Sequence, residues 1–323
     1  MAFSATDAAF EGFRLVRRNP LAVVAWALLY AVLTLTALFA LSRSIDPLIA
    51  WSERAEAMES GSPTPAEVGE MFQAFGAILF NLAWLLPVAL VVGAMLSAAV
   101  ARGVLNPKAG GFGYLRLGMD EVRVLVVTVV LSVLLTALAM LVFVAVGMIG
   151  GVASASGAGW GWLVAVVAGL GGFALLIWLS VRLSLAVPIT VAEKRMAFFD
   201  SFALTRGRLW PLFGMAIIAF VMVLIISFLS SIVTMPLSLM SGHDGWSFGT
   251  HDDPEAVRAA LDVSNPWVIA SAIVEAIVNA LTVGVLYAPF AAAYRDLRGV
   301  EAPGAWAGGR PVVGPPYSIV SSG

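Results

Sequence analysis

The sequence predicts an all-α, polytopic membrane protein with six transmembrane helices and short amphipathic helices at the interface. Hydrophobic residues make up 60% of the 323-residue chain, charged residues only 12%, and the mean hydropathy is +0.96. Soluble domains are about half apolar and about a quarter charged, so this composition excludes an ordinary soluble domain and a disordered chain. The apolar residues also gather into six segments, each long enough for a helix to cross a bilayer.

The six predicted spans are apolar on every side, unlike the alternating strands of a membrane barrel. They cover residues 21–41, 75–100, 122–149, 160–187, 211–236 and 266–290. The first is longer than the apolar core of a signal peptide, so we expect it to remain as an anchor. Together the spans predict one domain over residues 1–298. A cytoplasmic tail at 299–323, rich in Gly, Pro and Ser, is predicted to be disordered.

The positions of the 18 Lys and Arg predict how the spans are threaded. All of them except Arg43, Arg54 and Arg258 lie on one side of the predicted bundle, the side of both termini. Cytoplasmic loops carry the excess of Lys and Arg in membrane proteins. We therefore expect the N and C termini in the cytoplasm and the loops 42–73 and 237–265 outside.

Short helices are predicted beside the spans. Ser4 and Asp7 form a helix start ahead of a basic amphipathic helix over residues 5–18. Two placements of this helix stay open: in the membrane interface, with its arginines on lipid headgroups, or packed on the protein's own inner surface. The TPAE motif at 64–67 combines an N-cap, a proline and a capping glutamate, and the Asn-Pro pair at 265–266 opens the last span in a similar way.

Five arginines are predicted to bind lipid phosphate at the cytoplasmic face: Arg17, Arg18, Arg182, Arg206 and Arg208. Two of the segments involved, 10–21 and 199–212, share the pattern Phe-x-x-Phe-x-Leu-x-Arg, and each leads into a span. A guanidinium suits bidentate contact with phosphate, and anionic headgroups lie at this depth. The simpler alternative, which the sequence favours, is that these arginines are only the positive flank that sets the topology.

Glu275 is the only acid deep inside a predicted span. Asn279 and Thr282 follow on the same helix face, and Thr136 on the third span is expected at about the same depth. A carboxylate in a bilayer is unfavourable and indicates a functional site by default. We expect Glu275 to face the bundle interior, hydrogen-bonded to Asn279 or Thr136. Its role is either a proton or cation site or a neutral polar bridge between helices, and the sequence favours the bridge.

Small residues recur at every fourth position on two spans. They are Ala89, Gly93, Ser97 and Ala101 on the second span, and Ala272, Ala276, Ala280, Gly284 and Ala288 on the sixth. Such stripes let helix backbones approach closely within a membrane. They predict close packing inside the molecule, and the alternative is a seam between copies in a homo-oligomer.

Several kinds of chemistry are not expected. The chain has no cysteine, which excludes disulfides and thiolate sites. His243, His251 and Asp252 are of ligand type, but their spacing matches no standard metal motif, so we expect no metal and no cofactor. The net charge of −2 gives no reason to expect nucleic acid. No nucleophile–base arrangement lies in the spans, so we expect no enzyme.

The second half of the chain carries a family resemblance. It rests on two stretches, VRLSLAVPITVAEKRMAFFDSFALTRGRLWPLFG at 181–214 and AAAYRDLRG at 291–299. They resemble the multi-span membrane family that includes the membrane domain of glycerophosphoryl diester phosphodiesterases and related bacterial membrane proteins. Those enzymes also carry a catalytic barrel with a His–Arg pair and metal-binding acids, to which nothing here corresponds. The resemblance implies a bacterial inner-membrane module without the enzyme.

The sequence thus predicts a non-enzymatic, integral inner-membrane protein that acts as a lipid- or partner-binding scaffold or accessory module. Its expected partners are membrane lipids, through anionic headgroups on the cytoplasmic face, and a membrane-protein partner or a second copy of the chain. The alternative is a small permease or a lipid or solute transporter with Glu275 as an intramembrane polar site. A transporter requires a polar path through the bundle, whereas a scaffold requires only a dry core and an exposed surface.

Overall fold

The computed structural model describes residues 4–47, 64–109, 111–116, 118–155, 161–241, 258–259 and 261–299. Throughout this part of the chain the secondary structure is helical, without a strand, and six helices are long and apolar enough to cross a membrane. The protein is therefore an all-α membrane protein, and this prediction is confirmed. The predicted disordered tail lies, beyond Gly299, outside the described residues.

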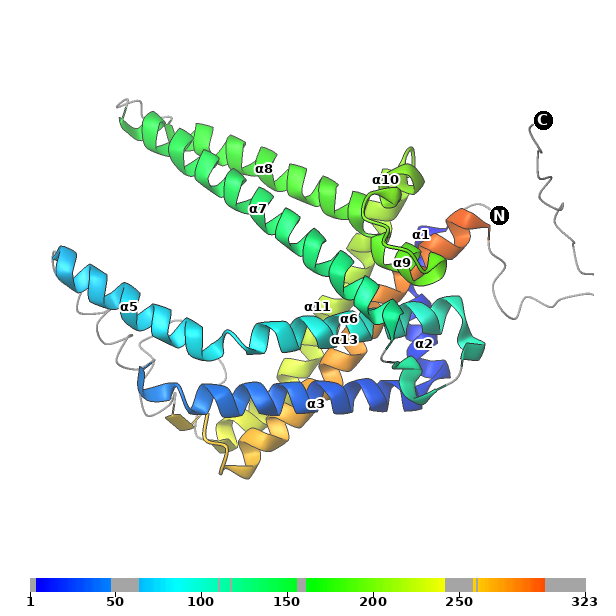
Figure 1. Cartoon of the computed structure of the whole chain (residues 1–323), viewed down its shortest axis with the longest axis horizontal. Coiled ribbons are helices and arrows are strands. Elements are labelled where there is room, and N and C mark those ends of the chain that lie inside the picture. The colour runs from blue at the N-terminus through cyan, green and yellow to red at the C-terminus, as the bar shows by residue number, and fades with distance from the viewer. Residues whose placement is uncertain are drawn as a thin grey trace, which may run out of the picture.

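The six spanning helices alternate in direction, so that their termini meet at two ends of the molecule (Figure 1). They are α3 (Pro20–Ser42), α6 (Leu85–Leu105), α7 (Met119–Ala155), α8 (Gly161–Leu183), α11 (Leu209–Ser241) and α13 (Pro266–Arg298). All but the second lie where the sequence predicts them, with shifted ends. The fourth prediction, 160–187, runs past the end of α8 at Leu183 and through a turn into the start of α9 (Ala186–Glu193).

The structure corrects the second predicted span, 75–100. This apolar run contains the end of one helix, α5 (Pro65–Leu82), and most of another, α6, with a turn between them at Ala83 and Trp84. Pro87 explains the break. It has no backbone N–H to donate to the Ala83 carbonyl, and its ring would clash with that carbonyl in a continuous helix.

Three predicted helix starts are confirmed. Ser4, Thr64 and Asn265 each accept a hydrogen bond from a backbone N–H in the first turn of the next helix, which is α1 (Ala5–Ala9), α5 or α13. At Thr64 the capping box is complete, because the Glu67 carboxylate accepts the Thr64 backbone N–H in return. These capping side chains accept hydrogen bonds from backbone N–H groups that have no partner inside the helix.

The predicted amphipathic helix 5–18 is divided into α1 and α2 (Glu11–Arg18), and both pack on the protein itself. α1 lies against α11 and α13, and α2 crosses α13. Gly12 lies at this crossing, where a Cβ atom would come within 2.5 Å of the Val285 Cα atom. Of the two predicted placements, the structure shows the one on the protein's own surface.

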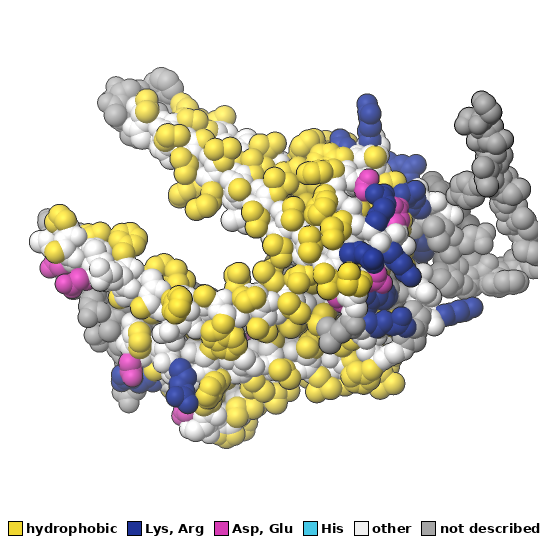
Figure 2. Space-filling model, viewed as in Figure 1, with side chains coloured by type: hydrophobic (Ala, Val, Ile, Leu, Met, Phe, Trp, Pro, Cys, Tyr) yellow, Lys and Arg dark blue, Asp and Glu magenta, His cyan; other side chains and the backbone are white. Residues whose placement is uncertain are grey.

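The helices converge at the end that holds the N terminus and splay apart toward the other end (Figure 1). There the α7–α8 hairpin leans away from α5 and α6, and a cleft with apolar walls separates them (Figure 2). The largest buried side chains lie toward the converging end, among them Trp26, Val124, Leu185, Leu212 and Met215. The converging end is therefore the packed part of the molecule.

The small-residue stripes contribute to this packing unequally. On α13 the residues Ala272, Ala276, Ala280 and Ala288 are all buried, and α13 contacts α3, α6 and α11. On α6 only the later half of the stripe is buried, while Ala89 and Gly93 are exposed where α6 borders the cleft. Close packing inside the molecule is therefore confirmed for α13 and for the end of α6.

Candidate functional site

Lys and Arg side chains gather at the converging end, which we call the basic end (Figure 2). They come from the termini of the spanning helices and from the short helices between them. The exposed ones are Arg17, Arg18, Lys108, Arg116, Lys194, Arg195, Arg206, Arg208 and Arg298. This end of the molecule is thus a cationic surface beside the apolar part of the spans.

Four of the five arginines predicted to bind phosphate lie on this surface without a protein partner. Arg17 and Arg18 end α2, and Arg206 and Arg208 follow α10 (Asp200–Thr205). All four are exposed, and none makes a hydrogen bond or ion pair with any residue that the structure describes. Their guanidinium groups therefore keep every donor available for an external anion.

Arg182, the fifth, has partners inside the protein. Its Nη1 atom donates to the Phe202 carbonyl at 3.3 Å and lies 3.5 Å from the Thr205 hydroxyl oxygen. Its guanidinium also lies 5.4 Å from the centre of the Trp178 ring, within cation–π range. The structure thus places Arg182 where it ties the end of α8 to α10.

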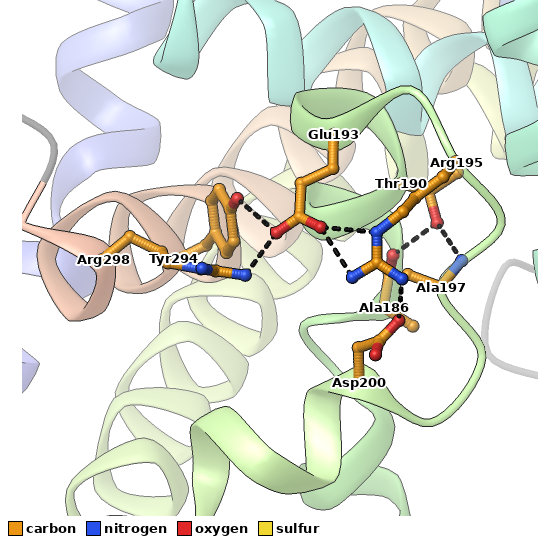
Figure 3. A network of polar contacts seen from close by, with 8 residues as sticks. All are labelled: Ala186, Thr190, Glu193, Arg195, Ala197, Asp200, Tyr294 and Arg298. Carbon is orange, nitrogen blue, oxygen red and sulfur yellow. Dashed lines mark hydrogen bonds and ion pairs between the residues drawn. The ribbon is translucent and has the colours of Figure 1, made fainter. Parts of the chain in front are cut away.

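An ion-pair network joins the connection after α9 (Ala186–Glu193) to the end of α13 (Figure 3). The Glu193 carboxylate accepts hydrogen bonds from the Tyr294 hydroxyl, from Arg298 and from Arg195. Arg195 also pairs with Asp200 at 2.8 Å. The hydrogen bond with Glu193, followed by that with Asp200, raises the pKa of Arg195 above its ordinary value. These acids are thus already paired and do not neutralise the four unpaired arginines.

A second ion pair, between Arg102 and Glu121, is buried where α6 ends and α7 begins. The two side chains are only 9% and 7% exposed. Arg102 also donates to the Tyr114 carbonyl at 3.0 Å, and Glu121 accepts the backbone N–H of Gly118 at 3.0 Å. Because a buried charge needs compensating hydrogen bonds, this pair holds Tyr114 and Gly118 in place between the two helices.

The short helix η2 (Phe112–Tyr114) in this connection lies against α3. The indole Nε1 of Trp26, a fully buried residue, donates to the Gly113 carbonyl at 2.8 Å. Tyr114 has a φ of +58°, a left-handed conformation that is unusual for a residue other than glycine. Beside this turn lies a pocket of about 330 Å³. It is lined by Arg18, Asn19, Pro20, Leu21, Ala22 and residues 111–114.

The structure corrects the expected position of Glu275. Glu275, Asn279 and Thr136 are all exposed at the molecular surface, and none of the three bonds to another or to any other described residue. Ala276 and Ala280 occupy the interior face of α13 instead. Successive helix residues are about 100° apart, so burying this alanine face turns Glu275 away from it.

A second pocket lies at the closed end of the cleft, where α7 and α8 meet α6, α9 and α13. Its volume is about 200 Å³, and its walls are mostly apolar. The polar groups in the lining are the hydroxyls of Ser97, Ser180, Ser184 and Tyr287. Ser97 donates to the Ala94 carbonyl of its own helix, and Ser184, which follows α8, donates to the Val181 carbonyl near the end of α8. Glu275 is not among the lining residues.

The weak metal candidates His243, His251 and Asp252 lie outside the described residues. Within the ranges that the structure describes, no three His, Asp or Glu side chains come together as metal ligands would. The expectation of no metal therefore stays a prediction.

The family model for a domain of unknown function, DUF7847, matches residues 5–297. The chain belongs to the DUF7847 family. The match covers all six spanning helices, from α1 almost to the end of α13. No curated protein and no solved structure matches the chain. The resemblance to the membrane domain of glycerophosphoryl diester phosphodiesterases is not tested by these comparisons and stays a prediction.

Two features of this DUF7847 domain had no recognised signal in the sequence. The Arg102–Glu121 pair joins residues on two separate helices. In the sequence, a charged residue at the end of a span is explained equally well by the rule that sets membrane orientation. The pocket beside η2 is formed by segments more than 80 residues apart, since Trp26 bonds to Gly113 across 87 positions. Only the unusual sequence GGFG at 110–113 points to a special backbone there.

Proposed function

We propose that this DUF7847 protein is a non-enzymatic scaffold or accessory module of the bacterial inner membrane, and that its basic end binds anionic lipid on the cytoplasmic face. One observation carries the proposal. Arg17, Arg18, Arg206 and Arg208 are exposed and unpaired among the described residues, whereas the acids Glu193 and Asp200 at the same end are already paired with Arg195 and Arg298. Exposed guanidinium groups without internal partners at a membrane boundary are suited to lipid phosphate.

The charge distribution supports the cytoplasmic orientation of this end. Of the described Lys and Arg, only Arg43 and Arg258 lie at the opposite end of the bundle. Anionic lipids give the cytoplasmic leaflet a negative surface potential, and each nearby Lys or Arg contributes about 1 kcal/mol of attraction. The same arginines therefore serve topology and lipid binding together, so the two explanations offered by the sequence do not compete.

The proposal is tested by the lipid that stays with the protein after purification in a mild detergent. We expect the Arg206→Gln/Arg208→Gln variant to retain less phosphatidylglycerol and cardiolipin than the wild type, measured by mass spectrometry of extracted lipids. Arg43→Gln is a control with the same type of charge change at the opposite end, and it should retain the wild-type amount. Equal retention by all three well-folded proteins would contradict lipid binding by the basic end.

A lipid or solute transporter is the second candidate, and the cleft favours it. The 200 Å³ pocket at its closed end is lined by Tyr287, whose hydroxyl has no hydrogen-bond partner among the described residues. Fluorescent phosphatidylglycerol in proteoliposomes separates the two candidates. A transporter would bring inner-leaflet lipid to the outer leaflet, where an external quencher removes its fluorescence. If that fluorescence were lost faster than in protein-free vesicles, we would assign the protein as a transporter and not as a scaffold.

A further inference from the structure

The residues that line the pocket beside η2 are of the types that would bind one lipid headgroup. Within it, Arg18 is exposed and has no partner among the described residues. The Tyr114 hydroxyl lies 3.3 Å from Asn19 Oδ1 and 3.2 Å from the Pro107 carbonyl, two acceptors that share its single proton, so the side-chain amide nitrogen of Asn19 keeps its donors free. None of the lining residues that the structure describes is acidic. The pocket therefore offers hydrogen-bond donors and positive charge with no acidic side chain in its lining to neutralise them, which is complementary to an anion.

The same pocket has an apolar side. Leu21 and Phe112 line it and are 74% and 64% exposed. Because α3 begins at Pro20, the pocket lies where the first spanning helix enters the hydrocarbon. Donors and exposed apolar side chains thus meet at the depth at which a phospholipid passes from its phosphate to its acyl chains. A free phosphate ion would make no use of the apolar side.

The wall formed by η2 is held in a strained conformation. Tyr114 keeps its positive φ because its carbonyl accepts from buried Arg102 and its hydroxyl reaches Asn19, while the neighbouring Gly113 carbonyl accepts from Trp26. A non-glycine residue in this region persists only when its surroundings hold it, and such strain is concentrated at ligand sites. The wall is thus pre-formed, so little ordering is required when a ligand binds.

We propose that this pocket binds the phosphate and glycerol of a single anionic phospholipid. Arg18 pairs with the phosphate oxygens, the Asn19 amide donates a further hydrogen bond, and the first acyl carbons lie over Leu21 and Phe112. The inference rests on the proposed lipid binding by the basic end. It adds a discrete one-lipid site to a surface that would otherwise attract lipid diffusely.

The experiment titrates delipidated wild-type protein in detergent with phosphatidylglycerol, phosphatidylcholine or inorganic phosphate, and counts bound adducts by native mass spectrometry. We expect one phosphatidylglycerol to bind more tightly than any later one. Arg18→Gln should weaken that first binding by about tenfold or more, the usual effect of losing a hydrogen bond to a charged group. Arg17→Gln is the matched comparison, since its guanidinium is also exposed and unpaired but does not line the pocket. It should weaken the first binding only by the smaller amount that a charge of the surrounding basic surface contributes.

A second variant keeps the test valid if Arg18→Gln folds poorly. Asn19→Asp preserves the oxygen that accepts from the Tyr114 hydroxyl but replaces the amide donors with negative charge. It should weaken the first phosphatidylglycerol adduct while leaving the unfolding temperature near that of the wild type.

The outcomes separate this inference from the proposed function. Equal, modest weakening by Arg17→Gln and Arg18→Gln would overturn the pocket while leaving diffuse lipid binding intact. Wild-type protein that binds phosphatidylcholine as well as phosphatidylglycerol would contradict the proposed function itself. Displacement of the first phosphatidylglycerol by inorganic phosphate at equal concentration would show that the site takes a free anion, and would overturn its assignment to a lipid.

Discussion

At the scale of single residues, two helix backbones meet at Gly12, where α2 crosses α13. A Cβ atom at this position would lie 2.5 Å from the Val285 Cα atom and 2.8 Å from the Gly284 carbonyl oxygen. Both neighbours are backbone atoms, so no side chain can rotate away to make room. Because Gly12 has no Cβ atom, α2 can cross α13 at this short distance. The α2–α13 crossing therefore depends on glycine at position 12.

We therefore expect Gly12→Ala to destabilise the protein by roughly 1–3 kcal/mol, the usual effect of overpacking a tight contact. The measurement is thermal unfolding in detergent, followed by tryptophan fluorescence. Gly93→Ala is the control, because a Cβ atom there meets nothing within 4 Å and alanine is the better helix former. A Gly12→Ala variant as stable as Gly93→Ala would show that α2 does not pack on α13 in this way.

At the scale of elements, the helix starts show what a sequence can specify. The caps at Ser4, Thr64 and Asn265 are predictable because each involves residues within three positions of one another. The break at Ala83 and Trp84 was missed because the apolar run continues through it, even though Pro87 marks the place. The orientation of Glu275 was also missed, because it depends on which helices cover α13 and not on α13 alone.

The start of α5 has a predicted pH dependence. Hydrogen bonds from the Thr64 backbone N–H and then from its hydroxyl lower the pKa of Glu67 below its ordinary value. A lowered carboxyl pKa means that the capping interaction is fully present above the ordinary glutamate range and is lost as the pH falls through the lowered pKa. We expect hydrogen exchange in the first turn of α5, corrected for intrinsic rates, to accelerate on acidification below about pH 4.

Thr64→Ala is the matched comparison for this pH effect. It removes the side-chain half of the capping box, so the first turn should exchange faster than in the wild type at neutral pH. Acidification should then change exchange less than it does in the wild type. A first turn whose protection in the wild type is independent of pH would show that the Glu67 carboxylate does not cap α5.

At the scale of the whole molecule, the helices converge on the basic end and diverge at the other (Figure 1). Between helices in lipid there is no hydrophobic driving force, so close packing and polar contacts must hold them together. Both occur at the basic end: the buried alanines in the last turns of α13 (Ala288 and Ala291–Ala293), the buried Arg102–Glu121 pair and the Glu193 network. Lipid bound at Arg18 would add a further contact at this end.

The orientation of this asymmetric molecule in the membrane is the last prediction. Since Lys and Arg concentrate at the basic end, that end should face the cytoplasm. The chain contains no cysteine, so single-cysteine variants report one position each. Glu70→Cys, exposed near the outer tip of α5, should react with a membrane-impermeant maleimide in intact cells. Lys108→Cys, exposed after α6, should react only after permeabilisation. The reverse pattern would place the unpaired arginines outside, away from the anionic leaflet, and would remove the electrostatic basis for lipid binding at the basic end.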